Sequence, residues 1–152
     1  ILRAMPNTPI KIGKVVILFC GNAFVTQDEI REAMDALEEG GLCEYVDEAT
    51  MVYACPVFSC SPAFIYMFIE SMADAAVQGG MPRAMAYTFA AQAVLGSAKM
   101  VLETGKHPGE LKDMVTSPAG TTIEAVRVLE EKGFRSAVFE CVKACAEKSA
   151  SL

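Results

Sequence analysis

The sequence lacks tryptophan altogether, and aromatic residues make up only 8% of its 152 residues. Nevertheless, 53% of the residues are apolar, and much of that share is alanine and methionine. This composition favours close-packed helices over a sandwich of aromatic and β-branched strands. The length suits one domain, or a small domain with part of another. The high apolar fraction also predicts a large apolar interface in addition to a core.

Positive charge is scarce as well. Lysine and arginine number 13 against 19 acidic residues, which gives a net charge of −6 and a pI near 4.8. Nucleic-acid binding depends on clustered basic residues, so we expect no nucleic-acid partner. The most apolar stretch, Pro62 to Val77, is too short for a membrane span and contains Glu70 and Asp74. We therefore also expect no membrane contact.

The cysteines do not fit a disulfide framework or a metal site. Six cysteines occur in a chain that is neither short nor loop-rich and shows no secretory leader, which favours reduced thiols and a cytoplasmic location. Cys141 and Cys145 are four residues apart but lack the further ligands of a zinc site, so we expect core packing and no metal. Cys55 and Cys60 flank an irregular, proline-containing segment without the spacing of a redox pair, and we interpret them as structural.

No enzyme constellation is complete. His107 precedes Pro108 at an expected helix start, where a cap or surface role is favoured and a general base is the alternative. Glu70 and Asp74 lie four residues apart in an apolar helix, where they form its wet edge or, alternatively, a paired-carboxylate site. A glycine-rich phosphate loop is also missing, so the main motif for any dinucleotide would lie outside this chain.

The first part of the chain has the pattern of an α/β domain. It begins without methionine and soon reaches a loop-like run from Met5 to Pro9, which is typical of a truncated product. Val15 to Cys20 and Cys43 to Val46 are expected strands, and the Thr26–Glu29 spacing predicts a capped helix between them. Two strands and one helix cannot bury a sheet on both faces. We expect residues 1–46 to be the end of an α/β domain whose beginning is absent.

From residue 47 to residue 152 the pattern becomes helical, with proline and glycine as the only punctuation. The helix from Pro62 is apolar almost all round, which predicts burial on most sides. So small a helical domain offers little interior for it, and a second copy of the chain is the expected cover. The expected helices run to Tyr53 before Pro56, from Pro62 to Gly79, from Pro82 to Gly105, from His107 to the next loop, from Thr122 to Gly133 and from Phe134 towards Ser149.

The segment from Lys112 to Thr122 concentrates the polar chemistry. Pro118 blocks the preceding helix, and Gly120 allows backbone angles that a side chain would forbid. Thr121 and Glu124 have the spacing of a capping box at the start of a new helix. Such a turn suits a small anion, such as a carboxylate or phosphate. A plain capped turn between helices is the alternative, and it is the commoner case.

A long run from Lys112 to Phe134 closely resembles the C-terminal signature of the pyrroline-5-carboxylate reductases. The resemblance extends through Leu95 to Met100, Ala73 to Ala76 and the loop Met5 to Pro9, and so covers essentially the whole chain. It implies reduction of 1-pyrroline-5-carboxylate to L-proline, the last step of proline synthesis, with NADPH or NADH. The implied fold is mainly α, a helical dimerisation domain like that of 6-phosphogluconate dehydrogenase, preceded by the last strands and helix of a Rossmann domain.

The resemblance also implies partners and domain roles. Residues 1–46 would be a remnant of the NAD(P)-binding Rossmann domain, and residues 47–152 the dimerisation and substrate-binding domain. The helical domain would interlock two subunits, and the dimers would assemble further, up to a decamer formed as a pentamer of dimers. We expect the chain alone to be inactive, because the nucleotide motif is absent from it.

The resemblance assigns a ligand to the Lys112 to Thr122 segment. Thr122 takes the catalytic position, with its hydroxyl at the ring nitrogen that gains a proton as hydride reaches the adjacent carbon. The residues assigned to the substrate are Val115, Ser117, Gly120, Thr121 and Thr122. The residues assigned to the cofactor are Glu48, Met114 and Asn7.

Two departures from the family pattern are evident. Phe58 to Ser61 replaces a serine–glycine run, which places side chains where a cofactor would approach closely. Ala119 replaces the first glycine of a pair, and we expect its backbone angles to stay in an ordinary region. Two alternatives follow: a non-catalytic dimerisation module, or a related imine or hydroxy-acid reductase acting on another small acid.

Overall fold

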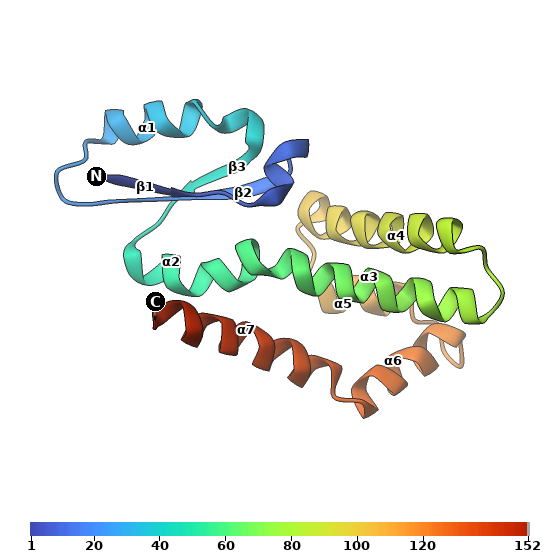
Figure 1. Cartoon of the computed structure of the whole chain (residues 1–152). Helices are drawn as coiled ribbons and strands as arrows, with labels where there is room; N and C mark the ends of the chain where they lie inside the picture. Colours follow the sequence, from blue (N-terminus) through green and yellow to red (C-terminus); the bar gives the residue numbers. More distant parts are fainter. Residues whose placement is uncertain (152) are drawn as a thin grey trace. The chain divides into compact units, whose positions relative to one another are not determined.

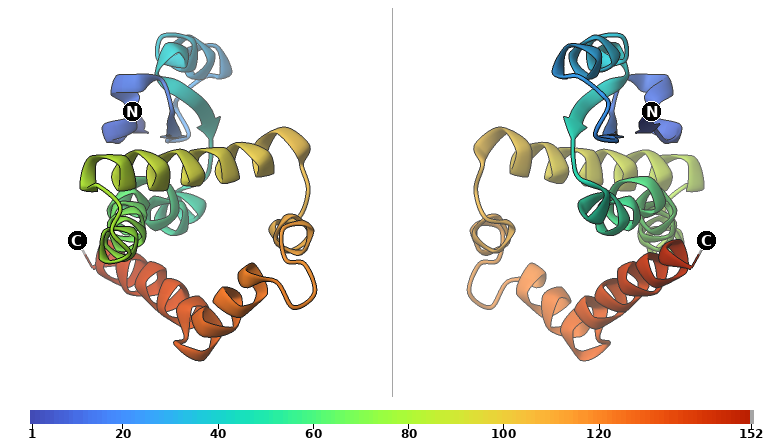
Figure 2. Two further views of the ribbon diagram at one scale, coloured as in Figure 1. Left: turned by 90° about the vertical axis from the view of Figure 1, so that its right-hand side faces the viewer. Right: turned by 90° about the vertical axis from the view of Figure 1, so that its left-hand side faces the viewer.

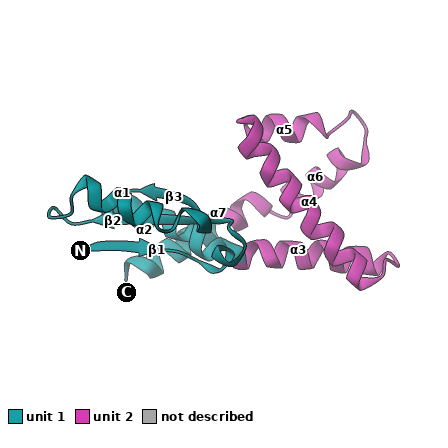
Figure 3. Ribbon diagram, turned by 90° about the horizontal axis from the view of Figure 1, so that it is seen from above, with its two compact units in different colours: residues 1–62, 139–152 teal, residues 63–138 magenta. Residues whose placement is uncertain are grey.

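The computed structural model describes residues 1–151, which divide into two compact units (Figure 1; Figure 3). Unit 1 comprises residues 1–62 with the C-terminal residues from Phe139 onward, and unit 2 comprises residues 63–138. The predicted domain boundary after residue 46 stays a prediction. The elements are β1 (Leu2–Met5), a 3-10 helix (Thr8–Ile12), β2 (Val15–Gly21), α1 (Gln27–Asp35), a second 3-10 helix (Glu38–Gly40), β3 (Gly41–Tyr45), α2 (Glu48–Cys55), a π-helix (Pro56–Cys60), α3 (Ser61–Gln78), α4 (Arg83–Thr104), α5 (Pro108–Met114), α6 (Thr121–Glu131) and α7 (Phe134–Ala150).

The sheet of unit 1 has three strands in the order β1-β2-β3. The two predicted strands are confirmed as β2 and β3, which pair in parallel with Val15 opposite Gly41. β1 was not predicted, and it pairs antiparallel with β2, with Leu2 opposite Gly21. The predicted loop from Met5 to Pro9 is also partly wrong, because Met5 ends β1 and a 3-10 helix begins at Thr8.

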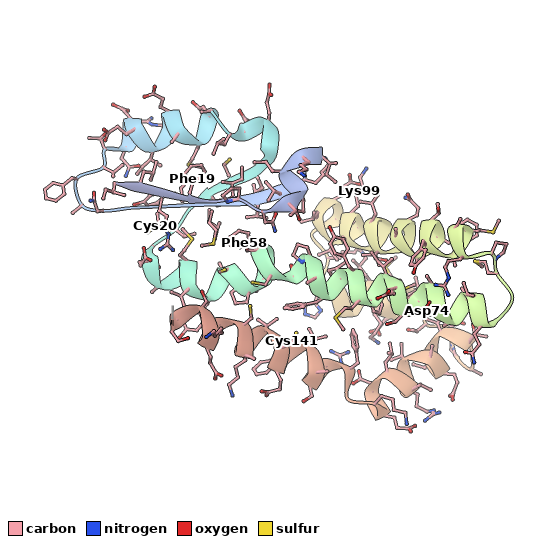
Figure 4. All side chains as sticks on the ribbon, in the orientation of Figure 1. Phe19, Cys20, Phe58, Asp74, Lys99 and Cys141 are labelled. Carbon is pink, nitrogen blue, oxygen red and sulfur yellow. The ribbon has the colours of Figure 1, made fainter. Side chains whose placement is uncertain are left out.

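β2 carries the core of unit 1 on both of its faces. Val15, Ile17 and Phe19 pack with side chains of α1, whereas Leu18 and Cys20 pack against Met51 of α2. This alternation follows from the two-residue period of a strand, and Phe19 and Cys20 are labelled in Figure 4. α2, which follows residue 46, covers the second face of the sheet, so the elements of residues 1–46 cover only one face by themselves (Figure 1).

The predicted capping box at the start of α1 is confirmed. The Thr26 hydroxyl accepts a hydrogen bond from the Glu29 amide at 3.3 Å, and the Glu29 carboxylate accepts one from the Thr26 amide at 2.8 Å. These bonds lower the pKa of Glu29. The helix ends at Asp35, and a 3-10 turn precedes Gly41.

The helix that begins at Glu48 continues without a break to Gln78. Asp47 caps its start, accepting a hydrogen bond from the Thr50 amide at 2.6 Å. The expected break at Pro56 is wrong, because the helix passes through the proline as a π-helix, Pro56–Cys60. A proline inside an α-helix lacks an N–H and crowds the preceding turn, and a local π-turn accommodates such a departure from the α-helical pattern. Within this 31-residue helix, the most apolar 18-residue window has a mean hydropathy of 1.6, so by length and composition alone the helix could cross a membrane. From the sequence, Pro62 to Val77 is too short for a membrane span, but the helix that contains this stretch already begins at Glu48.

Unit 2 is built on α3 and α4, which cross at a wide angle (Figure 2). Their contact is made of small side chains, Ala73, Ala86 and Ala90, with Ile69 and Val77 packed beside them. The small residues allow the helices to approach closely. The composition, rich in alanine and poor in aromatics, predicted this kind of packing.

An ion pair joins α3 to α4. Arg83 Nη1 lies 2.6 Å from Asp74 Oδ1 and 3.3 Å from the Tyr87 hydroxyl, and the guanidinium also lies over the Tyr87 ring. Asp74 is labelled in Figure 4. Asp74 thus bonds Arg83, and both it and Glu70 are exposed. The wet-edge interpretation of this acidic pair is favoured over a paired-carboxylate site.

Large apolar side chains remain exposed on α3 and α4. Met67 of α3 and Leu102 of α4 are 67% and 83% exposed. We call this set the apolar faces of α3 and α4. The set comprises Ile65, Tyr66, Met67, Phe68, Met72, Met85, Tyr87, Phe89, Leu95, Met100 and Leu102.

Candidate functional site

The turn between α5 and α6 is the centre of the candidate site in unit 2. The Gly120 amide donates to the Ser117 carbonyl at 3.0 Å, which closes a four-residue turn. Pro118 occupies its second position, and Ala119 its third with φ of 58°. A proline followed by a positive φ is the pattern of a type II turn. The turn directs the backbone straight into α6.

Ala119 and Gly120 exchange the roles expected of them. Ala119 was expected in an ordinary backbone region, but it adopts the left-handed conformation, which costs an L-residue about 1–2 kcal/mol. Gly120 was expected to supply unusual angles, but its φ is −78°. Instead, Gly120 is required by space, because a Cβ there would lie 2.4 Å from Ser117 Oγ. Because Gly120 has no Cβ, the Ser117 side chain can lie close to the backbone of the turn.

The start of α6 differs from the predicted capping box. Gly120, and not Thr121, is the N-cap, and no side chain in residues 1–151 caps this helix. Glu124 is unavailable for the box because it bonds Arg127, with Nε at 2.9 Å and Nη2 at 2.8 Å. The first amides of a helix need external acceptors when no cap is present. Thr121 and Thr122 occupy the first two positions of α6, so their amides are free to hold an anion.

The residues assigned to the substrate therefore gather around one turn. Ser117 and Gly120 belong to the turn itself, and the exposed Thr121 and Thr122 begin α6. Val115, 65% exposed, is the C-cap of α5. Apart from the half-buried Gly120, these residues are exposed on unit 2, which suits a site completed by a bound molecule.

Met114 ends α5 beside this turn and is 63% exposed. Lys106 Nζ approaches its sulfur at 3.9 Å, and the same ammonium pairs with Glu110 at 2.6 Å. His107, just before this helix, accepts a hydrogen bond from the Gly109 amide at 3.0 Å through Nδ1. The cap interpretation of His107 is confirmed.

Asn7 and Glu48, the other two residues assigned to the cofactor, lie in unit 1. The Asn7 amide donates to the carbonyl of Phe58, in the π-helix, and its Oδ1 is buried and accepts no hydrogen bond from the described residues. A buried acceptor without a partner fits an external N–H or O–H donor. Asn7 therefore has one free acceptor to offer a ligand.

Glu48 is engaged on both carboxylate oxygens. Arg3 Nη1 pairs with Oε1 at 2.9 Å, and the Cys20 thiol donates to Oε2 at 3.2 Å. Burial, together with this bond to Glu48, raises the pKa of Cys20. Sequence reasoning missed both neighbours, because Arg3 lies on a strand with no sequence signal and Cys20 resembled a core thiol.

These residues line an open cleft of about 540 Å³ at the carboxyl ends of β2 and β3. Ligands of open α/β sheets bind at such ends. No group of histidine, cysteine or acidic residues in the described part of the chain could hold a metal ion. The cleft is lined by Ile1, Arg3, Cys20, Gly21, Asn22, Tyr45, Asp47 and Glu48.

Comparison with known proteins identifies the family. Residues 48–152 match the family model "Pyrroline-5-carboxylate reductase dimerisation". The whole chain is 57% identical to the pyrroline-5-carboxylate reductase of Escherichia coli K12 and 43% identical to that of Methanosarcina acetivorans. It spans 56% of the length of each of these relatives.

Solved structures of the same family superpose closely. The reductase of Streptococcus pyogenes has a TM-score of 0.95 at 32% identity, over 99% of this chain and 58% of that one. The Plasmodium falciparum pyrroline carboxylate reductase, solved with NADP bound, has a TM-score of 0.93 at 32% identity, over 99% of this chain and 62% of that one. The predicted fold, a helical dimerisation domain preceded by a small α/β segment, is confirmed. The chain belongs to the pyrroline-5-carboxylate reductase family.

Proposed function

We propose that this chain is the substrate-binding and dimerising part of an enzyme that reduces 1-pyrroline-5-carboxylate to L-proline with NADPH or NADH. The observation that carries the proposal is the 57% identity to a reductase of this name over the whole chain. The uncapped start of α6 supports it, because it suits a carboxylate. The sequence contains no glycine-rich phosphate loop, so the chain alone is expected to show no turnover.

The substrate carboxylate is held by the amides of Thr121 and Thr122, next to Gly120, whose own amide closes the turn on the Ser117 carbonyl. They lie at the positive end of the α6 dipole, which favours a negative charge. Ser117 and Val115 line the pocket beside them. The unusual angles of Ala119 support this arrangement, since backbone strain tends to persist where a site requires it.

Thr122 is the catalytic residue. Its hydroxyl hydrogen-bonds the ring nitrogen and holds it for protonation, while the carboxylate contacts fix the ring. When bound, a reduced nicotinamide supplies the hydride that the imine carbon receives. Positioning and polarisation are sufficient protein contributions for reduction of an imine.

The residues assigned to the cofactor fit it in part. The free, buried Oδ1 of Asn7 fits an amide donor such as a carboxamide. Glu48 is already paired with Arg3 and Cys20, so it fits a role in shaping the cleft. Met114 offers an exposed apolar surface to a ring. Asn7, Glu48 and Met114 keep the cofactor roles that the family resemblance assigns to each of them, and the main binding motif of the cofactor lies outside this chain.

The partner is a second copy of the chain. The apolar faces of α3 and α4 are exposed in the single chain, and only 6% of the apolar window within Glu48–Gln78 is buried. Large exposed apolar patches mark interfaces, and the matching family model is a dimerisation model. We propose a homodimer that can assemble further into a pentamer of dimers, in the cytoplasm, where its six cysteines stay reduced.

Binding of L-proline to the chain tests the site directly. Titration calorimetry should detect proline, and Thr122→Ala should weaken it about tenfold or more, because a hydrogen bond is lost. Thr88→Ala, on exposed α4 of the same unit, is the matched control and should leave binding unchanged. In a longer form that carries the nucleotide motif, NADPH oxidation with pyrroline-5-carboxylate completes the test. A folded dimer without turnover would overturn the proposed function.

A second candidate is a non-catalytic dimerisation module. Phe58 to Ser61, where the family has a serine–glycine run, favours it because side chains occupy the cofactor approach. Intact dimers that bind neither proline nor cofactor would support the module. A related imine or hydroxy-acid reductase would instead reduce other small acids in a substrate panel.

A further inference from the structure

Arg127 joins two glutamates on the surface of α6, within unit 2. Its Nε and Nη2 donate to Glu124 Oε1 at 2.9 Å and 2.8 Å, and its Nη1 donates to Glu131 Oε2 at 2.7 Å. All three side chains are more than half exposed. Exposed ion pairs add little to stability, so the stability of α6 is a poor reason for this network. Its effect on the position of Glu124 is a better one.

The start of α1 shows where a glutamate at the same spacing goes when no arginine holds it. The Glu29 carboxylate turns back over the first turn and accepts hydrogen bonds from the Thr26 amide at 2.8 Å and from the Thr26 hydroxyl at 2.9 Å. The nearby Arg31 pairs with Asp28 instead. A glutamate three residues into a helix therefore reaches the amides at its start by itself.

Glu124 follows Thr121 at the same spacing as Glu29 follows Thr26. The Thr121 amide is one of the two that we assign to the substrate carboxylate. A Glu124 side chain folded back like that of Glu29 would accept the hydrogen bond of this amide and place its own charge at the positive end of α6. It would compete with the substrate, because both groups are carboxylates.

We propose that Arg127 is a positioning residue that keeps the start of α6 open by holding the Glu124 carboxylate away from Thr121. The proposal rests on the proposed function, because it concerns the amides assigned to the substrate. Arg127 grips one Glu124 oxygen with two N–H groups, and Glu131 holds the guanidinium from one turn further along the helix. The substrate carboxylate thus meets free amides and need not displace a carboxylate of the chain itself.

Titration with L-proline measures the effect on binding. Arg127→Met removes the guanidinium and should weaken proline binding about three- to tenfold, because the freed Glu124 carboxylate caps the helix in place of the ligand. Arg135→Met is the matched control. It removes an exposed arginine of the same unit that pairs with Glu130 at 2.6 Å, and it should leave binding unchanged. Unchanged binding by Arg127→Met would overturn the proposal.

A second substitution separates the position of Glu124 from the charge of Arg127. If Arg127 only attracted the substrate by its charge, the loss in Arg127→Met would not depend on Glu124. Adding Glu124→Ala to Arg127→Met removes the carboxylate that folds back, so the affinity should return to within about twofold of that of the unaltered chain. A double variant that binds as weakly as Arg127→Met would overturn the proposal.

Hydrogen exchange of the Thr121 amide, followed by NMR, tests the same step without a ligand. This amide should exchange more slowly in Arg127→Met than in the unaltered chain, because Glu124 then accepts its hydrogen bond, and the double variant should restore fast exchange. Unchanged exchange in Arg127→Met would overturn the role of Arg127 alone. An unaltered chain that binds no proline would instead overturn the proposed function, together with the proposal that rests on it.

Discussion

Ala119 is the residue whose backbone conformation departs furthest from what its side chain prefers. Among residues 1–151 it is the non-glycine residue with a positive φ, 58°. It follows Pro118 in a turn that ends at the proposed carboxylate contacts. The strain therefore lies next to the chemistry, which is the usual place for it.

Ala119→Gly should stabilise the chain by up to about 1 kcal/mol, because relief of the left-handed penalty outweighs the opposing cost of glycine's greater unfolded-state entropy. Urea unfolding measures the difference. Ala125→Gly, within α6, is the matched control and should destabilise by about 1 kcal/mol. Equal losses for both substitutions would mean that the turn carries no strain.

Gly120→Ala should weaken proline binding about tenfold or more, because a Cβ 2.4 Å from Ser117 Oγ forces the turn to move. Ser117→Ala on the same background removes that hydroxyl oxygen and should recover part of the affinity. The Ser117 carbonyl, 3.1 Å from the same Cβ, keeps the recovery incomplete. Calorimetric binding by the two variants measures the coupling, and an unchanged affinity in Gly120→Ala would contradict the proposed role of the turn.

At the scale of elements, one spacing gave two different outcomes. Thr26–Glu29 forms a capping box, whereas Thr121–Glu124 does not. The difference lies in the neighbours, since Gly120 takes the cap position and Arg127 binds Glu124. A local sequence pattern cannot weigh these competitors, so the sequence predicted the helix but not the free amides at its start.

The strands, too, were predictable only where the local sequence carried the signal. β2 was predictable because its β-branched and apolar run is buried on both faces. β1, with Arg3 and Ala4 at its centre, has no such run and forms because β2 pairs with it. Pro56 was interpreted as a helix break, but the helix continues through it as a π-helix, Pro56–Cys60. Pairing and packing decide these cases, and they lie outside the local sequence.

The capping box of α1 should give the chain a distinct pH dependence. Hydrogen bonds from Thr26 lower the pKa of Glu29, so their stabilisation is fully present above about pH 4.5 and is lost as the pH falls through the lower, folded value. Glu29→Gln keeps a hydrogen-bond acceptor but cannot titrate. The difference in unfolding free energy between the two chains should be constant above about pH 4.5 and should change only below it. A change confined to neutral pH would rule out this assignment.

At the scale of the molecule, composition predicted the outcome better than any motif did. The alanine-rich contact of α3 with α4 and the exposed apolar faces both match the expectation of a core plus an interface. The family resemblance, and not residue spacing, assigned the site. Its eight residues fall in two places, six around the α5–α6 turn and two in unit 1.

Met67→Lys should weaken the homodimer, because it places a charge on a side chain that is 67% exposed in the apolar face of α3. Sedimentation should show a shift towards monomer. Gln78→Lys, an exposed polar position at the end of the same helix, should leave the dimer intact. Dimers that persist unchanged in Met67→Lys would place the interface elsewhere.

The apolar faces of α3 and α4 also make the stability of the folded chain depend on protein concentration. If their cover is a second copy, unfolding releases two chains from one dimer, and the midpoint temperature must rise with protein concentration. A chain at nanomolar concentration would then be less stable than the same chain at micromolar concentration, with no change in sequence or solvent. The helix that is too apolar to stand alone makes the abundance of the protein a determinant of its own stability.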